Sequence, residues 1–247
     1  MSFKKNKYVI IRQVLSHEMC EFAFNYLCFK KKVFNWIENP LSGLSCNFHV
    51  GRPGDKNYGK NKLKDIYSEP FLSTHSFSIR GSVGFDMLME KLRPRIQKEI
   101  KLELIPTYSY ARIYTKGDCL PKHVDREECE ISSTLSLGGN PWNLYLRGKD
   151  STQNIKISLK MGDLVIYRGL EMLHWRNTFK KDLCFQLFFH YNDKNGPYGW
   201  KNKYAGRPFL GAPTMREGDT AELFKRSQYE KWVKEILKNA PERKHKK

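Results

Sequence analysis

The sequence lacks the features of a membrane protein and of a disulfide-stabilised one. Its six cysteines include no CxxC pair and follow no regular spacing, so we expect free thiols rather than disulfides. No run of about 18 apolar residues occurs, and the start, MSFKKNKYVIIRQVL, is interrupted by Arg12 and is not typical of a signal peptide. Internal repeats and low-complexity blocks are also absent. We therefore expect a soluble, cytoplasmic protein with no membrane partner.

Acidic residues are few compared with basic ones. The chain has 44 Lys and Arg against 26 Asp and Glu, a formal net charge of +18. This balance favours acidic partners such as nucleic acid, although lysines spread over a solvated surface explain it equally well. With 247 residues, 40% of them hydrophobic, the chain can bury a substantial core. We expect a single domain over 1–247, with its core at about 102–193, a strand, helix and lid region at 1–101, and a tail and helix at 194–247.

A histidine and an aspartate lie two positions apart at His123 and Asp125. Side chains alternate between faces in an extended segment, so this imidazole and this carboxylate point the same way. A second histidine, His174, follows a Gly-Asp turn and a short apolar strand. Two histidines and one carboxylate that leave coordination positions open are typical of non-haem Fe(II) oxygenases, whereas a structural zinc site closes with four ligands. Core histidines and a surface carboxylate are the competing explanation.

The order of motifs resembles that of the 2-oxoglutarate and Fe(II)-dependent dioxygenases, most closely the prolyl-4-hydroxylase-like branch. The resemblance is carried by YARIYTKGDCLPKHVD, EISSTLSLGG, MGDLVIYRGLEMLHWR and QLFFHYND, and it covers residues 108–193. It implies an α+β fold with a double-stranded β-helix (jelly-roll) core, supporting N-terminal helices and a C-terminal helix. It also implies Fe(II), 2-oxoglutarate as cosubstrate and O2, with ascorbate in support. The implied reaction hydroxylates a C–H bond and releases succinate and CO2.

The resemblance also implies roles for individual residues. His123, Asp125 and His174 would be the metal ligands and the catalytic centre. In the similar enzymes, a tyrosine at the position of Tyr114 donates a hydrogen bond to the distal carboxylate of 2-oxoglutarate.

This chain departs from the family at the residue that clamps the distal carboxylate. The similar enzymes place a lysine or arginine on the last core strand, where this sequence has Cys184. Because a buried carboxylate needs a cationic partner, another residue must take this role. Our preferred candidate is Arg176, whose planar guanidinium can donate two hydrogen bonds to a carboxylate. The other candidates are Lys180, Lys181 and Arg112.

Three smaller polar residues are expected around the same acid. Thr134 and Ser136 share the face of Ser132 in the strand at 130–137, where hydroxyl groups leave room and donate hydrogen bonds. Strand propensity and solvent exposure are competing explanations for these hydroxyls. Gln186 is expected to share the inward face with Cys184 and to help hold the acid.

Two arginines allow more than one role. Arg112 is expected to point inward, where its partner is either a carboxylate, Asp125 or Glu130, or the cosubstrate. Arg126 directly follows Asp125, and we expect it to orient this ligand rather than to contact the substrate.

The remaining elements follow from local patterns. Ser16 is expected to cap a helix with apolar positions at Met19, Phe22, Phe24, Tyr26 and Leu27. A second helix at 83–100 continues through Pro94 and places Phe85, Leu88, Leu92 and Ile96 on one stripe. The segment 39–73 is either a lid over the site or an ordinary surface insertion. Other expected elements are strands at 8–15, 102–114, 142–146, 155–159, 164–167 and 183–191, an ordered tail at 196–213 and a final helix at 220–237.

The substrate is not determined by the sequence. The resemblance suggests a prolyl or other peptide side chain, while the net charge leaves nucleic acid open and a small molecule is a further alternative. A zinc hydrolase or a cupin-like binding module without turnover would use the same three ligands. The strand order and the lack of a well-placed general base favour an oxygenase. The sequence does not predict an oligomeric state.

Overall fold

A computed structural model describes residues 3–37 and 77–212. The segment 39–73 and the final helix expected at 220–237 lie outside these residues. The described helices are α1 (Phe3–Asn6), α2 (His17–Ile37) and α3 (Val83–Ile100), with short 3-10 turns η2 (Glu127–Cys129) and η3 (Lys203–Gly206). The strands are β1 (Tyr8–Ile11), β2 (Phe77–Arg80), β3 (Leu104–Thr115), β4 (Leu120–His123), β5 (Ile131–Gly139), β6 (Leu144–Gly148), β7 (Ile155–Ile157), β8 (Leu164–Arg168), β9 (Met172–Arg176) and β10 (Leu183–Asp193).

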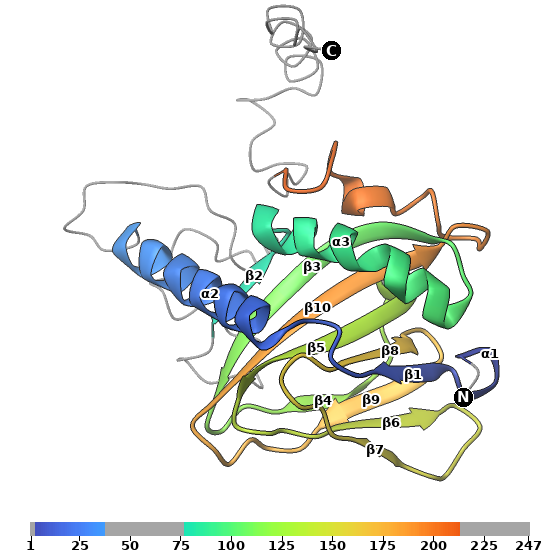
Figure 1. Ribbon diagram of the computed structural model, residues 1–247. Helices are drawn as coiled ribbons and strands as arrows, with labels where there is room; N and C mark the ends of the chain where they lie inside the picture. Colours follow the sequence, from blue (N-terminus) through green and yellow to red (C-terminus); the bar gives the residue numbers. More distant parts are fainter. Residues whose placement is uncertain (1–2, 38–76, 213–247) are drawn as a thin grey trace, which may run out of the picture. The chain divides into compact units, whose positions relative to one another are not determined.

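These strands form two antiparallel sheets (Figure 1). The larger sheet has the order β1-β8-β5-β10-β3-β2, and the smaller sheet has the order β4-β9-β6-β7. Helices α2 and α3 lie against the larger sheet, and α3 contacts β3 (Figure 1). The expected double-stranded β-helix with supporting N-terminal helices is therefore confirmed.

The two long helices bury different proportions of their expected apolar positions. In α3, Phe85, Leu88, Leu92 and Ile96 are all buried, as the sequence pattern predicts. Helix α2 begins as expected, because the Ser16 hydroxyl accepts a hydrogen bond from the backbone N–H of Met19 at 3.2 Å. Its buried face, however, is formed by Cys20, Ala23 and Leu27.

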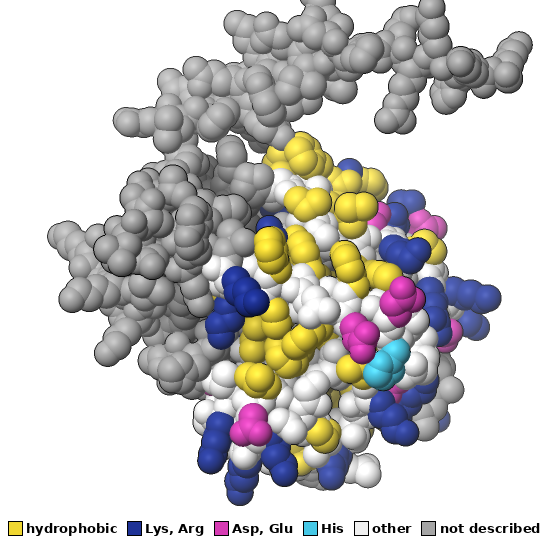
Figure 2. Space-filling view, turned by 60° about the vertical axis from the view of Figure 1, so that its left-hand side comes forward, with side chains coloured by type: hydrophobic (Ala, Val, Ile, Leu, Met, Phe, Trp, Pro, Cys, Tyr) yellow, Lys and Arg dark blue, Asp and Glu magenta, His cyan; other side chains and the backbone are white. Residues whose placement is uncertain are grey.

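The inclusion of Phe22 in the apolar stripe of α2 was wrong, because Phe22 lies off this face and its side chain is 64% exposed. Phe29 of α2 and Met87 of α3 are also exposed. The space-filling view shows hydrophobic side chains gathered on one face, with lysine and arginine side chains among them (Figure 2). No α-helix in the described ranges combines the length and the apolar character needed to cross a bilayer.

Three short strands escaped the sequence analysis: β2, β4 and β9. His123 ends β4 and His174 lies inside β9, whereas we expected both histidines to lie between strands. The two strands pair with each other, with His123 directly opposite His174. Strand β1 is shorter than expected because Gln13 has a left-handed backbone conformation (φ 48°) and Val14 donates to the carbonyl of Gly162 instead.

Strand β10 occupies the middle of the larger sheet. Gln186 is paired with Arg112 of β3 on one side and Ser136 of β5 on the other. His190 is paired in the same way with Tyr108 and Ser132. Because directly paired residues project to the same face of a sheet, rows of polar and aromatic side chains line the inner face. Most of the predicted site residues lie in these rows.

The tail after β10 is described up to Ala212. It is held by a buried ion pair between Arg207 and Asp86 of α3, with Nη1 and Oδ2 2.6 Å apart. Arg207 also donates to the carbonyl of Thr107 in β3 at 3.1 Å. The tail thereby connects α3 to the larger sheet.

Candidate metal centre

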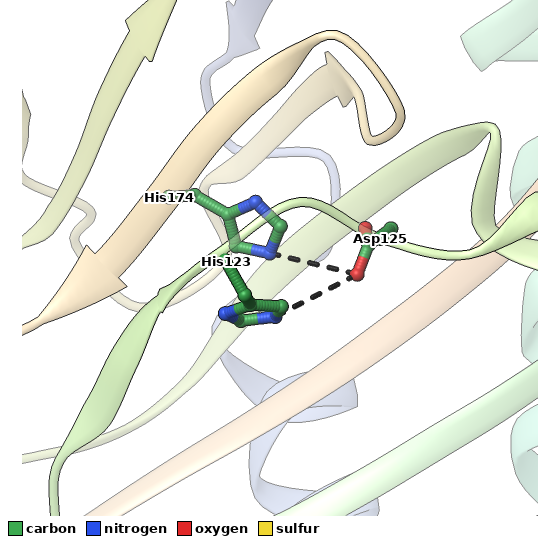
Figure 3. Close-up of side chains that lie close together, drawn as sticks. All are labelled: His123, Asp125 and His174. Carbon is green, nitrogen blue, oxygen red and sulfur yellow. Dashed lines mark ion pairs between the residues drawn. The ribbon is translucent and has the colours of Figure 1, made fainter.

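Two strands and a loop bring the three predicted ligands together. The ligand atoms of His123, Asp125 and His174 all lie within 4.8 Å of one another. Oδ1 of Asp125 is 3.8 Å from Nε2 of His123 and 3.6 Å from Nε2 of His174. Both imidazoles are turned toward this carboxylate (Figure 3). The geometry fits one ion held from one side by two nitrogens and an oxygen.

Hydrogen bonds orient both imidazoles for metal binding. Nδ1 of His123 lies 2.8 Å from the carbonyl oxygen of Pro121, and Nδ1 of His174 lies 3.0 Å from that of Met172. A carbonyl only accepts, so Nδ1 carries the proton and Nε2 keeps its lone pair toward Asp125. Burial also lowers the pKa of His174 below its usual value, against the opposing effect of Asp125. His174 is therefore neutral at neutral pH, which is the form that binds a metal.

Asp125 is fixed by groups that the sequence analysis did not assign to it. Its Oδ2 accepts a hydrogen bond of 2.6 Å from the Ser132 hydroxyl, and its backbone N–H donates to the carbonyl of Gly169 at 2.9 Å. Ser132 Oγ also lies 3.0 Å from Nδ1 of His190, which is buried on the inner face. Outer contacts of this kind hold a ligand in position and tune its metal affinity.

The expected role of Arg126 in orienting Asp125 is not seen. Arg126 instead forms an ion pair with Glu128 and donates to the hydroxyl of Tyr108. The side chain that donates to Asp125 is Ser132, which the sequence analysis placed on the same face as Thr134 and Ser136 without linking it to Asp125.

A cavity of about 270 Å³ is lined by three of the predicted cosubstrate residues, Arg176, Gln186 and Ser136. Arg176 is two residues beyond His174 and is 2% exposed. One of its terminal nitrogens donates to the carbonyl of Trp142, and the other donates to Oε1 of Gln186 at 3.2 Å. Its Nε is buried and has no hydrogen-bond partner among the residues described. Among the described residues, no carboxylate forms an ion pair with Arg176, and a buried cation of this kind fits an acidic ligand.

Three other predicted cosubstrate residues, Tyr114, Thr134 and Arg112, lie on the same inner face. Thr134 is buried between Ser132 and Ser136 along β5. Tyr114 is also buried, and its ring meets that of Trp142 edge-on with 4.9 Å between centroids. Their contact with a cosubstrate stays a prediction.

The carboxylate partners considered for Arg112 do not pair with it. Arg112 is buried and donates to the hydroxyl of Tyr110. Glu130 instead accepts hydrogen bonds from the side chain of Asn192 at 3.1 Å and the backbone of Asp193 at 3.0 Å. Asp125, also within the described ranges, instead faces the two histidines, with Oδ1 3.8 Å from Nε2 of His123 and 3.6 Å from Nε2 of His174.

Cys184, the residue expected in place of a strand cation, lies on β10. Cys184 is buried, and its sulfur accepts a hydrogen bond from Nε2 of Gln186 at 3.1 Å. Lys180 and Lys181 are exposed before β10. Of the candidate cations, Arg176 is the one that lines the cavity.

Comparisons with known proteins agree with this architecture. No protein-family model matches the sequence, and no curated protein does so either. A prolyl-4-hydroxylase from Pseudomonas putida superposes with a TM-score of 0.54 at 13% identity, over 77% of this chain and 95% of that one. A prolyl hydroxylase from Trichoplax adhaerens, solved with a hypoxia-inducible-factor peptide fragment, gives 0.50 at 12% identity, over 78% and 86%.

A third solved structure is the non-haem α-ketoglutarate-dependent epimerase SnoN from nogalamycin biosynthesis. Its TM-score is 0.55 at 12% identity, over 87% of this chain and 93% of that one. At these identities the similarity establishes the fold and leaves substrates open. The chain therefore has the double-stranded β-helix fold of the 2-oxoglutarate and Fe(II)-dependent oxygenases, with prolyl hydroxylases among its structural neighbours.

Proposed function

We propose that the protein is a non-haem Fe(II) and 2-oxoglutarate-dependent dioxygenase that hydroxylates a C–H bond of its substrate. The observation that carries this proposal is the cluster of His123, Asp125 and His174, together with the buried Arg176, which lines the cavity and lies two residues beyond His174 on β9. Two histidines and a carboxylate on one side of an ion suit Fe(II), because the other positions remain open for cosubstrate and dioxygen.

The residues around the metal site would have separate roles in binding the ion and in orienting its ligands. When bound, Fe(II) with 2-oxoglutarate and O2 supplies the oxidising chemistry that releases succinate and CO2. His123 and His174 present Nε2 to the ion, each fixed by a backbone carbonyl at Nδ1. Ser132 holds Oδ2 of Asp125, so that Oδ1 faces the two imidazoles.

Arg176 would bind the distal carboxylate of the cosubstrate. Its Nε is available for a hydrogen bond, and Gln186 holds one end of the guanidinium. Ser136 lines the same cavity and has a hydroxyl to donate. Tyr114, Thr134 and Arg112 lie on the same inner face and are proposed as further contacts. An arginine from β9 thereby replaces the cation that the similar enzymes carry on the last core strand.

A peptide or protein side chain is the proposed substrate class, because one structural neighbour was solved with a peptide fragment. A zinc hydrolase is the second candidate, since three protein ligands also suit catalytic zinc. Within the described ranges, however, the metal-binding cluster contains only its three ligands, with no further carboxylate in it to serve as general base.

Succinate formation by the iron-loaded protein tests the proposal. The protein is loaded under anaerobic conditions and then given 2-oxoglutarate, ascorbate and air. We expect slow succinate release that is lost in His123→Ala and Asp125→Ala but kept in His17→Ala, which alters an exposed histidine at the start of α2. Preferential binding of zinc, with neither succinate formation nor 2-oxoglutarate binding by calorimetry, would refute the oxygenase assignment.

Arg176→Gln separates the cosubstrate site from the metal site. We expect its affinity for 2-oxoglutarate to fall by about 10- to 100-fold, because a charge-assisted hydrogen bond is lost, while its affinity for zinc is retained. Arg147→Gln is the matched control, since Arg147 lies on the opposite face of β6 from the buried Leu144 and Leu146. Equal 2-oxoglutarate affinity in both variants would exclude Arg176 as the carboxylate ligand.

A further inference from the structure

Two arginines flank Tyr108 at the β2 edge of the larger sheet. Arg80 ends β2 and is paired in register with Tyr110, so its side chain shares the inner face with Tyr110 and Tyr108. Arg126 approaches the same tyrosine from the loop that follows the metal ligand Asp125. Neither arginine has a role in the proposed handling of metal or cosubstrate.

Arg80 is a cation with few partners. Its guanidinium carbon lies 3.9 Å from the centroid of the Tyr108 ring, and its Nε is buried without a hydrogen-bond partner in the described segments. Burial lowers the pKa of Arg80 from its usual value, which reflects the loss of hydration around the charge. A poorly hydrated guanidinium of this kind binds an anion more strongly than one in bulk water.

Arg126 adds a second cation to the cluster. Its Nη2 lies 3.4 Å from the Tyr108 hydroxyl, and its Nε forms an ion pair of 2.6 Å with Glu128. Glu128 is also the carboxylate that interacts electrostatically with Arg80. Within the described part of the chain, one carboxylate therefore faces two guanidinium groups, which gives these three side chains a net positive charge. The side chain of Arg126 is 49% exposed, so a ligand can reach it.

The cluster is coupled to the metal centre through side chains in contact. The Tyr108 ring lies 4.6 Å from the His190 ring, and His190 reaches Asp125 through the hydroxyl of Ser132. Next along the inner face, Tyr110 and Phe188 pair with 6.0 Å between ring centroids, and both are partly exposed. Aromatic surface therefore lies beside the two cations on the face that carries the metal centre.

We infer that Arg80 and Arg126 bind an anionic group of the substrate, a carboxylate or a phosphate, while Tyr110 and Phe188 contact its apolar part. This inference rests on the proposed oxygenase function and specifies the substrate class for that site. The anion subsite is separate from the cosubstrate cavity, because Arg176 contacts Gln186 whereas Tyr108 is paired with His190, four residues further along β10.

A purely structural role is the competing explanation. The stacking of Arg80 on Tyr108 and the ion pair of Arg126 with Glu128 would then only hold β2 and the ligand loop in place. Replacing either arginine would lower stability, but binding would not depend on the charge of a ligand. The two explanations therefore differ in how affinity changes between an anionic probe and a neutral one.

Calorimetry with small aromatic probes tests the inference. Phenyl phosphate, phenylacetate and the neutral phenylacetamide are titrated into the full-length, zinc-loaded protein in the presence of saturating 2-oxoglutarate, which excludes them from the cavity beside Arg176. We expect at least one anionic probe to bind about tenfold more tightly than phenylacetamide. Whether the phosphate or the carboxylate binds more tightly identifies the anion.

The variants Arg80→Gln and Arg126→Gln should each lose most of this preference for anions, whereas the control Arg147→Gln should keep it. Arg80→Lys should retain part of it, which guards against a folding defect in Arg80→Gln. The inference would be overturned if both glutamine variants kept the wild-type preference for anionic probes, or if they lost as much affinity for phenylacetamide as for the anionic probes. A wild-type protein with no preference for anionic probes would also overturn it. Binding of 2-oxoglutarate is measured in the same samples, so a failure of the proposed function appears separately as a failure of that titration.

Discussion

Ser132 links the candidate ligand Asp125 to a buried histidine. Its hydroxyl donates to Oδ2 of Asp125 at 2.6 Å and lies 3.0 Å from Nδ1 of His190. A hydroxyl has one proton, so with Asp125 accepting it, Nδ1 of His190 must be the protonated nitrogen that donates to Ser132. The position of the carboxylate therefore depends on two residues that do not contact the metal.

We predict that Ser132→Ala lowers zinc affinity by about 10- to 100-fold, the usual effect of removing a hydrogen bond to a metal ligand. Competition with a coloured chelator measures this affinity. Ser133→Ala is the matched control, because Ser133 is equally buried but bonds to the backbone of Phe189 instead. If both variants bind zinc alike, Ser132 does not orient Asp125.

His190 should make stability depend on pH. Burial lowers its pKa from 6.5 to about 4, so between these values the unfolded chain binds more protons than the folded protein. This contribution to stability is complete above pH 6.5 and decreases as the pH falls toward 4, by about 3 kcal/mol in total. Urea unfolding of the wild type and His190→Gln measures it.

In that experiment, the wild type should lose more stability than His190→Gln between about pH 7 and pH 4. His17→Gln, at an exposed position, should follow the wild type. Identical losses in the wild type and His190→Gln would mean that His190 is not held neutral by its surroundings.

Among the elements, the turn between β8 and β9 controls the position of Asp125. A Cβ on Gly169 would lie 2.2 Å from the carbonyl oxygen of Cys129 and 2.5 Å from Oδ2 of Asp125. Both distances are too short for real contacts, so the turn or the ligand loop would have to move. The sequence gives no sign of this restriction, because Gly169 in RGLEM resembles any turn glycine.

Gly169→Ala should therefore destabilise the protein by about 1–3 kcal/mol, as overpacking does, and should weaken zinc binding as Asp125 is displaced. Urea unfolding and chelator competition measure the two effects. Gly148→Ala is a suitable control, since its new Cβ would meet only Ser151 at 3.8 Å. Wild-type zinc affinity in Gly169→Ala would show that the turn adapts without moving Asp125.

The sequence analysis was correct where the alternation of side chains along a single extended segment was enough to predict which face they share. The alternation in β5 placed Ser132, Thr134 and Ser136 on the inner face, and the spacing of His123 and Asp125 predicted their convergence. It failed for β4 and β9, whose sequences LPKH and MLHWR show no regular alternation of apolar and polar residues. Their pairing across the sheet, which sets His123 opposite His174, is a long-range contact that no local signal reports. The partners of Arg112 and Arg126 include Tyr110 and Glu128, each only two residues away, and were missed because the sequence analysis considered other residues for these two arginines.

At the scale of the molecule, the buried carboxylate of Asp86 joins three parts of the chain. It accepts hydrogen bonds from the backbone and hydroxyl of Ser109 in β3, from Arg207 at 2.6 Å, and from the backbone of Gly211 at 2.7 Å. Asp86 and Arg207 are 1% and 2% exposed. A buried ion pair that loses one member leaves an uncompensated charge.

Asp86→Asn should consequently lower the free energy of unfolding by about 3–5 kcal/mol, as measured by urea denaturation. Lys194→Gln provides the contrast: it removes the exposed ion pair with Glu103 and should change stability by less than about 1 kcal/mol. Similar effects from the two substitutions would show that Asp86 is not an anchor of the tail.

The central position of β10 has a consequence for biosynthesis. This strand is the last of those described to leave the ribosome, yet it lies between β3 and β5, which are made much earlier. The larger sheet cannot close while the chain is still growing through this region. During that interval the facing edges of β3 and β5 remain open, and unpaired edges invite aggregation. The nascent chain is therefore most exposed to edge-to-edge aggregation until residue 193 has emerged.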